Sequence, residues 1–349
     1  MKTAQLRRIG FILGVVVLLL VAAALIYKRY FSLIALPEVE LRPAKVLSGP
    51  EDNPHYLWYN PQSIATDGKG NLYICDMGNH RIVKYDSTLR YIMEIGRAGQ
   101  GPGEFQYPID VKIGKDGDIF VLDGGNRRIQ VFDSTGKYLR SFPSTTVLAR
   151  ELVIDSKNNV YLMSPGDSKS LVTVFSPVGE KVGERGMKEP FPAGARQWQK
   201  SYIVRLATDA DDNLYIQFGT FARLQKYDSD GKLIFDSDFS RVKNAHDYLT
   251  KEPQAGLVRT GGGKALRFMS VSPLVFFCRN KILLTAGDLT VFDKQSGEPT
   301  SILELKDAEG KPILGTFATG ASDPSRIVSL DLVRNRVYIY YLPCHEYGE

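Results

Sequence analysis

The sequence is poor in the residues that build disulfide scaffolds and metal centres. It contains 3 cysteines, 4 histidines and 2 tryptophans among 349 residues. Cys75, Cys278 and Cys344 form no C-x-x-C pair, so the sequence offers neither a zinc knuckle nor a thioredoxin-like motif. Cys75 and Cys278 lie in or beside apolar runs and are expected in the core. One disulfide that includes Cys344 is compatible with the count, although the sequence does not identify its partner.

The main part of the chain also lacks an excess of charge of either sign. The whole chain has 44 basic and 39 acidic residues, a net charge of +5. The first 30 residues contain no acid and hold five of the bases, namely Lys2, Arg7, Arg8, Lys28 and Arg29, so 39 residues of each sign remain. A balanced body lacks the basic surface that nucleic-acid binding requires, and we expect no nucleic-acid partner.

Two common catalytic motifs are absent as well. No G-x-S-x-G nucleophile elbow occurs, and Gly261-Gly262-Gly263-Lys264 lacks the upstream glycine of a phosphate-binding loop. With 43% apolar and 24% charged residues, the chain is nevertheless long enough for one large or two ordinary globular domains. The composition therefore excludes collagen-like and disordered classes.

Residues 1–30 are predicted to form an N-terminal membrane anchor. Residues 9–27 contain no charge, and 19 residues at about 1.5 Å each just cross a hydrocarbon core of about 30 Å. The small excess of bases before this run favours a cytoplasmic N-terminus, which would place the body on the periplasmic or extracellular side. A cleaved signal peptide, with a site near residues 22–24, is the alternative. Residues 31–37 would be a linker.

An internal repeat organises the rest of the chain. Residues 61–86 align with residues 108–133 at an offset of 47 positions. The alignment pairs Pro61 with Pro108, Tyr73 with Phe120, Asp76 with Asp123, Asn79 with Asn126, Arg81 with Arg128 and Asp86 with Asp133. Weaker copies follow at residues 152–162, 206–216, 275–284 and 327–339. Repeats of this length are typical of solenoids and propellers.

Each copy contains short apolar or β-branched runs that are separated by turns rich in Asp, Gly and Asn. Four such runs per copy predict an all-β fold, a six-bladed β-propeller over residues 38–345 with four antiparallel strands per blade. Residues 40–47 resemble a fourth strand without a blade before it, so we expect them to complete the last blade. Insertions at residues 187–201 and 240–267 interrupt the repeat.

The two best copies resemble the NHL repeat. The resemblance is carried by Asp76, Asn79 and Arg81 with Ile82, by their counterparts Asp123, Asn126 and Arg128 with Ile129, and by the aromatic-Asp pair that follows. It implies a six-bladed propeller, as in NHL proteins that are protein-interaction platforms or sensor domains outside the membrane. Some relatives are metal-dependent lyases with several channel histidines, but the four histidines of this chain do not follow that pattern.

Candidate ligand-binding residues lie at the start of the innermost strands. Alignment of the copies makes Ser63, Asp110, Glu151 and Arg205 equivalent, which predicts that they share one mouth of the central channel. Asp110 and Glu151 could hold a polar or cationic ligand or a Ca²⁺ ion. In the alternative interpretation, Arg205 neutralises the two acids in a structural network.

Two further groups of residues have predicted roles. The repeated Asp76, Asn79, Arg81, Asp123, Asn126 and Arg128 are predicted to be structural, with Asn79 and Asn126 suited to left-handed turns and the arginines bridging to the aspartates. In the first insertion, Phe191 and Trp198 either contact a partner or ligand or simply cover the rim of the ring.

The sequence therefore predicts a membrane-anchored, extracytoplasmic binding module without catalysis of its own. A protein, a glycan or a small molecule would bind at the propeller mouth, and the sequence does not indicate the oligomeric state. No cofactor is expected apart from the Ca²⁺ ion considered above. The alternative is a Ca²⁺-dependent hydrolase or lactonase that uses Asp110 and Glu151.

Overall fold

The computed structural model describes most of the repeat region. The described residues are 36–47, 53–144, 150–165, 167–188, 204–218, 222–242 and, with several gaps, 275–344. None of the helices within these ranges is long and apolar enough to cross a membrane. The predicted anchor at residues 1–30 lies outside the described residues.

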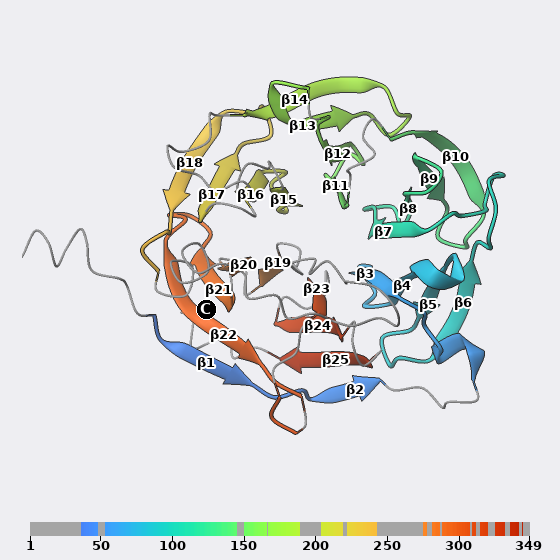
Figure 1. Ribbon diagram of the computed structural model, residues 1–349, viewed down its shortest axis with the longest axis horizontal. Coiled ribbons are helices and arrows are strands. Elements are labelled where there is room, and N and C mark those ends of the chain that lie inside the picture. The colour runs from blue at the N-terminus through green and yellow to red at the C-terminus, as the bar shows by residue number, and fades with distance from the viewer. Residues whose placement is uncertain are drawn as a thin grey trace, which may run out of the picture.

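The described strands form six separate sheets that surround a common axis (Figure 1). Numbered in chain order, blade 1 consists of β3 (Pro61–Thr66), β4 (Leu72–Asp76), β5 (Arg81–Tyr85) and β6 (Tyr91–Ile95), and blade 2 of β7 (Pro108–Ile113), β8 (Ile119–Asp123), β9 (Arg128–Phe132) and β10 (Tyr138–Pro143). Blade 3 consists of β11 (Leu152–Ile154), β12 (Val160–Met163), β13 (Ser170–Phe175) and β14 (Lys181–Met187), and blade 4 of β15 (Val204–Thr208), β16 (Leu214–Phe218), β17 (Arg223–Tyr227) and β18 (Leu233–Asp238). Blade 5 contains β19 (Val275–Phe277), β20 (Lys281–Ala286), β21 (Asp288–Asp293) and β22 (Pro299–Leu305), and blade 6 contains β23 (Gly315–Thr319), β24 (Arg326–Asp331) and β25 (Arg336–Tyr341). The first strand of each sheet is innermost. This is the predicted six-bladed β-propeller, and the all-β class is confirmed.

Strand position within a blade follows from the hydrophobic pattern. The second strands β4, β8 and β16 are buried at every residue, as expected for strands that are covered on both faces. The outer strands β6 and β10 alternate between more and less exposed residues, which is typical of strands with one solvated face. Two short 3₁₀ helices, η1 (Pro54–Tyr56) and η2 (Met77–Asn79), lie in the turns of blade 1.

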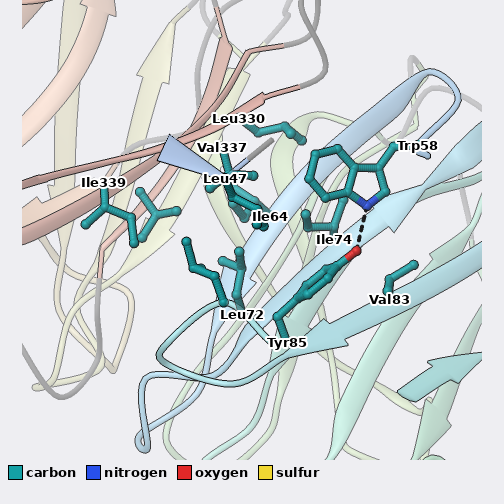
Figure 2. Close-up of a cluster of buried hydrophobic side chains, with 12 residues drawn as sticks. Leu47, Trp58, Ile64, Leu72, Ile74, Val83, Tyr85, Leu330, Val337 and Ile339 are labelled. Atoms are coloured by element: carbon teal, nitrogen blue, oxygen red, sulfur yellow. Dashed lines mark hydrogen bonds between the residues drawn. The ribbon is translucent and has the colours of Figure 1, made fainter. Parts of the chain in front are cut away.

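The core consists of apolar clusters between neighbouring blades. In the cluster between blades 6 and 1, Val337 and Ile339 of β25 pack with Ile64 and Leu72 of blade 1 (Figure 2). Tyr85 lies in the same cluster, and its hydroxyl oxygen accepts a hydrogen bond of 2.9 Å from Trp58 Nε1. Equivalent clusters occupy the other five interfaces. Each blade buries its two faces against its two neighbours, so closure of the ring also covers the faces that the first and last blades would otherwise expose.

Ring closure differs in part from the prediction for residues 40–47. Only β2 (Lys45–Leu47) completes blade 6, as an antiparallel fourth strand beside β25. The preceding β1 (Glu38–Leu41) instead runs parallel to β22 as a fifth strand of blade 5 (Figure 1). Val39 and Leu41 pack against the cluster between blades 5 and 6, while the chain passes between the two sheets at Pro43, which has no N–H to donate.

The closure predicts an effect of shortening Leu47, whose side chain lies in the cluster between blades 6 and 1. Leu47→Ala should lower the free energy of unfolding by about 2–4 kcal/mol because it leaves a cavity between the first and last blades. Chemical denaturation measures this change. Val46→Ala is the matched control on the same strand, since Val46 is 38% exposed. Equal effects of the two substitutions would contradict the closure by β2.

Candidate functional site

A hydrogen-bond relay joins the innermost strands of blades 1 to 4. Ser63 Oγ accepts a hydrogen bond of 3.0 Å from the Val111 N–H of blade 2. Asp110 Oδ2 accepts one of 2.9 Å from the Leu152 N–H of blade 3. Glu151 Oε1 accepts one of 2.7 Å from the Leu206 N–H of blade 4. Each donor follows the next member of the predicted set, so equivalent positions are linked from blade to blade.

The predicted candidates Ser63, Asp110, Glu151 and Arg205 therefore lie in series along the inner wall. Lys112 adds a cation that the sequence interpretation missed, and its Nζ lies 2.7 Å from both carboxylate oxygens of Asp110. Lys112 follows Asp110 by two positions on β7, so strand alternation places both side chains on one face. The two-residue spacing of Asp110 and Lys112 is the sequence signal from which this ion pair could have been predicted.

The acids of the inner wall are buried and paired with cations. Asp110 is 2% exposed and Glu151 is 9% exposed. Burial raises the pKa of the Glu151 carboxyl above its usual 4.5, although the Arg205 guanidinium, whose Nη1 lies 3.6 Å from Glu151 Oε2, opposes that shift. The negative charge of Asp110 raises the pKa of Glu151 further. These contacts support the structural interpretation in which bases neutralise the acids.

These residues fit a calcium ion poorly. Calcium takes six to eight oxygen ligands, and carboxylates must be free to supply them. Both oxygens of Asp110 accept hydrogen bonds from Lys112, and Glu151 Oε1 is used by the Leu206 N–H. Within the described part of the chain, no group of three or more His, Cys, Asp or Glu residues is arranged to hold a metal ion. A calcium ion would therefore have to displace Lys112.

The repeated Asp, Asn and Arg residues attach the loop that leads into each of the first two blades. Asp76 is fully buried, and its Oδ2 accepts hydrogen bonds of 2.8 Å from Asn79 Nδ2 and from Arg81 Nε. Its Oδ1 accepts one of 2.7 Å from the Tyr59 N–H of the incoming loop. Arg81 Nη2 also donates to the Pro54 and Leu57 carbonyls of this loop. The contacts are those expected of a structural motif.

Blade 2 repeats this arrangement. Asp123 Oδ2 accepts from Asn126 Nδ2 at 2.8 Å and from Arg128 Nε at 2.9 Å, and its Oδ1 accepts from the Gln106 N–H at 2.7 Å. The left-handed turn residues were misplaced by one position, however. His80 and Arg127, with φ of 56° and 54°, adopt that conformation, whereas Asn79 and Asn126 use their side-chain amides as hydrogen-bond donors.

A contiguous aromatic group lies on the same loops. Tyr59 is 69% exposed and Tyr107 is 53% exposed, and each precedes an innermost strand by one or two residues. The Tyr107 N–H donates to His80 Nδ1 at 3.1 Å, and the two rings lie 4.8 Å apart between centroids. The Tyr59 ring covers Gly78, where an added Cβ would lie 2.2 Å from Tyr59 Cδ1. The turn 78–80 thus connects both tyrosines.

The backbone holds Tyr107 in an uncommon conformation. Its φ is 51°, as is that of the equivalent Asn60, and both residues precede a proline. Asn tolerates the left-handed region, but a bulky residue there is an outlier that costs on the order of 1–3 kcal/mol. Strain of this kind is typical of functional sites, so Tyr107 is a candidate contact residue that sequence reasoning missed.

The predicted contacts Phe191 and Trp198 lie outside the described residues, as does most of the two predicted insertions. The described ends show where the insertions connect. The first begins near the end of β14 and leads to β15, and the second follows β18 and leads to β19. Both therefore occur in the type of loop, from an outer strand to the next innermost strand, that carries Tyr59 and Tyr107.

The fold is a six-bladed β-propeller, and side chains of the inner wall bond blades 1 to 4 to one another. Comparison with known proteins agrees at this level. The DUF5128 family, described as a 6-bladed beta-propeller, matches residues 56–171, which is less than half of the chain. No curated protein sequence matches the chain.

Solved structures show the same architecture at low sequence identity. A putative exported protein from Bacteroides fragilis is 11% identical, with a TM-score of 0.52, and the match covers 84% of this chain and 88% of that one. The Cps50 β-propeller domain of Myceliophteria thermophila is 9% identical, with a TM-score of 0.51 and coverage of 86% and 99%. An inactive virginiamycin B lyase from Staphylococcus aureus, solved with quinupristin, is 11% identical, with a TM-score of 0.48 and coverage of 81% and 80%. These similarities concern the fold alone.

The raised pKa of Glu151 predicts how stability depends on pH. The folded state favours the protonated carboxyl, so the associated stability is fully present below pH 4.5 and is lost as the pH rises through the raised pKa. Glu151→Gln cannot ionise and keeps an oxygen that accepts the Leu206 N–H. The thermal midpoint of Glu151→Gln should therefore rise relative to that of the wild type as the pH increases above 4.5.

Thermal unfolding of both proteins at stepped pH measures the difference. The exposed Glu180, changed to Gln, controls for the loss of one negative charge. A difference that is constant across the range, or that favours the wild type increasingly at high pH, would contradict the assignment of a buried Glu151.

Proposed function

We propose that this protein is a membrane-anchored binding module whose propeller lies outside the cytoplasm and holds a ligand on the face that carries Tyr59 and Tyr107. The observation that carries the proposal is the rigid, exposed pair of tyrosines on loops that lead into the innermost strands. Aromatic anchors fixed in advance are typical of binding surfaces, because little conformational entropy is lost on association. The loops containing the predicted contacts Phe191 and Trp198 are of the same type.

The buried acids of the inner wall support binding rather than catalysis. Asp110 and Glu151 each accept a main-chain N–H of the neighbouring blade, and each has a cationic partner. A general acid or base must be free to exchange a proton with a substrate. Carboxylates that hold two blades together have a structural role and are not free for this proton exchange.

The proposed location rests on the first 30 residues and on cysteine chemistry. Residues 9–27 are an uncharged apolar run, with three bases before it and two after it. Cys344 is disulfide-bonded, whereas Cys75 is a buried free thiol whose pKa is raised by burial. Structural disulfides persist in oxidising compartments, which supports an extracytoplasmic propeller.

Site-specific photo-crosslinking of the full-length protein in its native membrane tests the proposal. A photoreactive amino acid at Leu57, which is 50% exposed on the Tyr59 loop, should yield a discrete adduct. The same amino acid at Ile92, which is 45% exposed on the outer strand β6, is the matched control and should yield none. Adducts from Ile92 alone, or equal adducts from both positions, would contradict a ligand on the proposed face.

A Ca²⁺-dependent hydrolase is the alternative function, and calcium titration separates the two. We expect calcium to leave the thermal midpoint of the wild type unchanged, because Lys112 is bonded to both oxygens of Asp110. A bound ion would raise the midpoint by mass action on the folded state. A calcium-dependent rise that Asp110→Asn abolishes would favour the hydrolase and would overturn our assignment of the inner wall.

A further inference from the structure

The exposed aromatic site, defined as Tyr59, Tyr107 and the turn 78–80 between them, has a chemical character that restricts its ligand. Its two exposed rings belong to different loops, and both contact the same turn. Tyr59 lies on Gly78, and Tyr107 lies against His80. The site is therefore a continuous surface at the junction of blades 1 and 2 and does not consist of two unrelated exposed residues.

The rings are held in place before any ligand arrives. Gly78 has no side chain, and the Tyr59 ring occupies the space that a Cβ would need. Tyr107 is fixed through its main-chain N–H to His80 Nδ1 and by the left-handed backbone that precedes Pro108. A strained aromatic residue that remains half exposed gains little packing energy for the fold. The Tyr107 ring is therefore available to contact an external molecule.

Amide side chains lie close to the two tyrosines in the sequence. Asn60 follows Tyr59 directly and Gln62 lies two residues further on, and Gln62 Nε2 donates to Asn60 Oδ1 at 2.8 Å, which leaves other donors and acceptors of both side chains for a ligand. Gln106 precedes Tyr107, and the exposed Asn79 lies in the turn. Amides offer both donors and acceptors, so they suit hydroxyl groups, which also donate and accept.

Within the described residues, the charged side chains bonded to or directly following the turn 78–80, Asp76 and Arg81, are paired with one another. Asp76 beneath the turn accepts hydrogen bonds from Asn79, Arg81 and the Tyr59 N–H, and Arg81 also pairs with Glu94. An anionic ligand would need a cation that is directed outward, and a cationic ligand would need a free carboxylate. Neither is provided by the residues that flank the tyrosines, which are Trp58, Asn60, Gln106 and Pro108.

We infer that the exposed aromatic site binds a neutral carbohydrate chain, with Tyr59 and Tyr107 stacking on the C–H faces of sugar rings and the amides of Asn60, Gln62 and Gln106 bonding the hydroxyl groups. Sugar rings combine an apolar face with a hydroxyl edge, and a rigid aromatic ring beside amides complements both. This inference rests on the proposed function and specifies the class of its ligand. A protein partner is the competing outcome.

The test uses the full-length protein in detergent on an array of neutral oligosaccharides, with uronate-containing and sulfated oligosaccharides on the same array. We expect the wild type to bind at least one neutral oligosaccharide and to bind none of the charged oligosaccharides more tightly than that one. Its affinity for that oligosaccharide is then measured by calorimetry. Absence of binding to every neutral oligosaccharide, or preference for charged ones, would overturn the inference.

A pair of matched variants ties the binding to the site. Tyr107→Gly removes the ring and relieves the strain, because glycine adopts positive φ freely, so the thermal midpoint should not fall. Asn158→Gly makes the same kind of backbone change at another left-handed residue, with φ of 63°, in the turn between β11 and β12, and leaves both rings and the amides of the site in place. We expect Tyr107→Gly to lower the affinity at least about tenfold and Asn158→Gly to leave it nearly unchanged. Equal affinities of the wild type and Tyr107→Gly would overturn the inference.

The experiments distinguish failure of the carbohydrate inference from failure of the proposed function. If the photoreactive residue at Leu57 captures a protein while no neutral oligosaccharide binds, the binding module stands and the carbohydrate assignment fails. If a neutral oligosaccharide binds but Tyr59→Ala and Tyr107→Gly bind it as well as the wild type does, carbohydrate binding lies elsewhere and the exposed aromatic site is not responsible.

Discussion

The bond between a side chain of one innermost strand and a main-chain N–H of the next is the interaction on which the inner wall of blades 1 to 4 depends. An innermost strand pairs with its own blade along one edge only, and its other edge presents backbone groups that need partners. Ser63, Asp110 and Glu151 supply acceptors to Val111, Leu152 and Leu206. The relay adds directional bonds between neighbouring innermost strands, whose residues Val111, Leu152 and Leu206 also belong to the apolar clusters between blades.

A second set of bonds makes the loop face rigid. Buried Asp76 and Asp123 each accept a main-chain N–H of the incoming loop, and the arginine of each motif donates to carbonyls of the same loop. Because these aspartates are fully buried, the loops are bonded to the interior of the blade and not only to its surface. The positions of Tyr59 and Tyr107 follow from this attachment. The same motif that stabilises the blades therefore positions the residues that we assign to binding.

The sequence predicted the features that recur in every blade, and it did not predict the features that depend on the three-dimensional arrangement. The offset of 47 residues between Pro61 and Pro108 predicted the blades, since each four-stranded sheet needs the same turns and apolar runs. The equivalence of Asp110 and Glu151 was also visible. The hydrogen bonds that Asp110 and Glu151 accept from backbone N–H groups could not be predicted, because a main-chain donor has no sequence signature. The division of residues 38–47 between blades 5 and 6 depends on which sheet edge is open, which only the three-dimensional arrangement defines.

The most direct test of the relay is hydrogen exchange at the Leu152 amide. In the wild type and in Asp110→Asn, which keeps a side-chain oxygen as acceptor, the Leu152 N–H should be protected. In Asp110→Ala the acceptor is lost, so Leu152 should exchange faster while the Leu206 amide, which is held by Glu151, keeps its protection. Unchanged protection of Leu152 in Asp110→Ala would contradict the account, because the blades would then be joined without the side-chain bond.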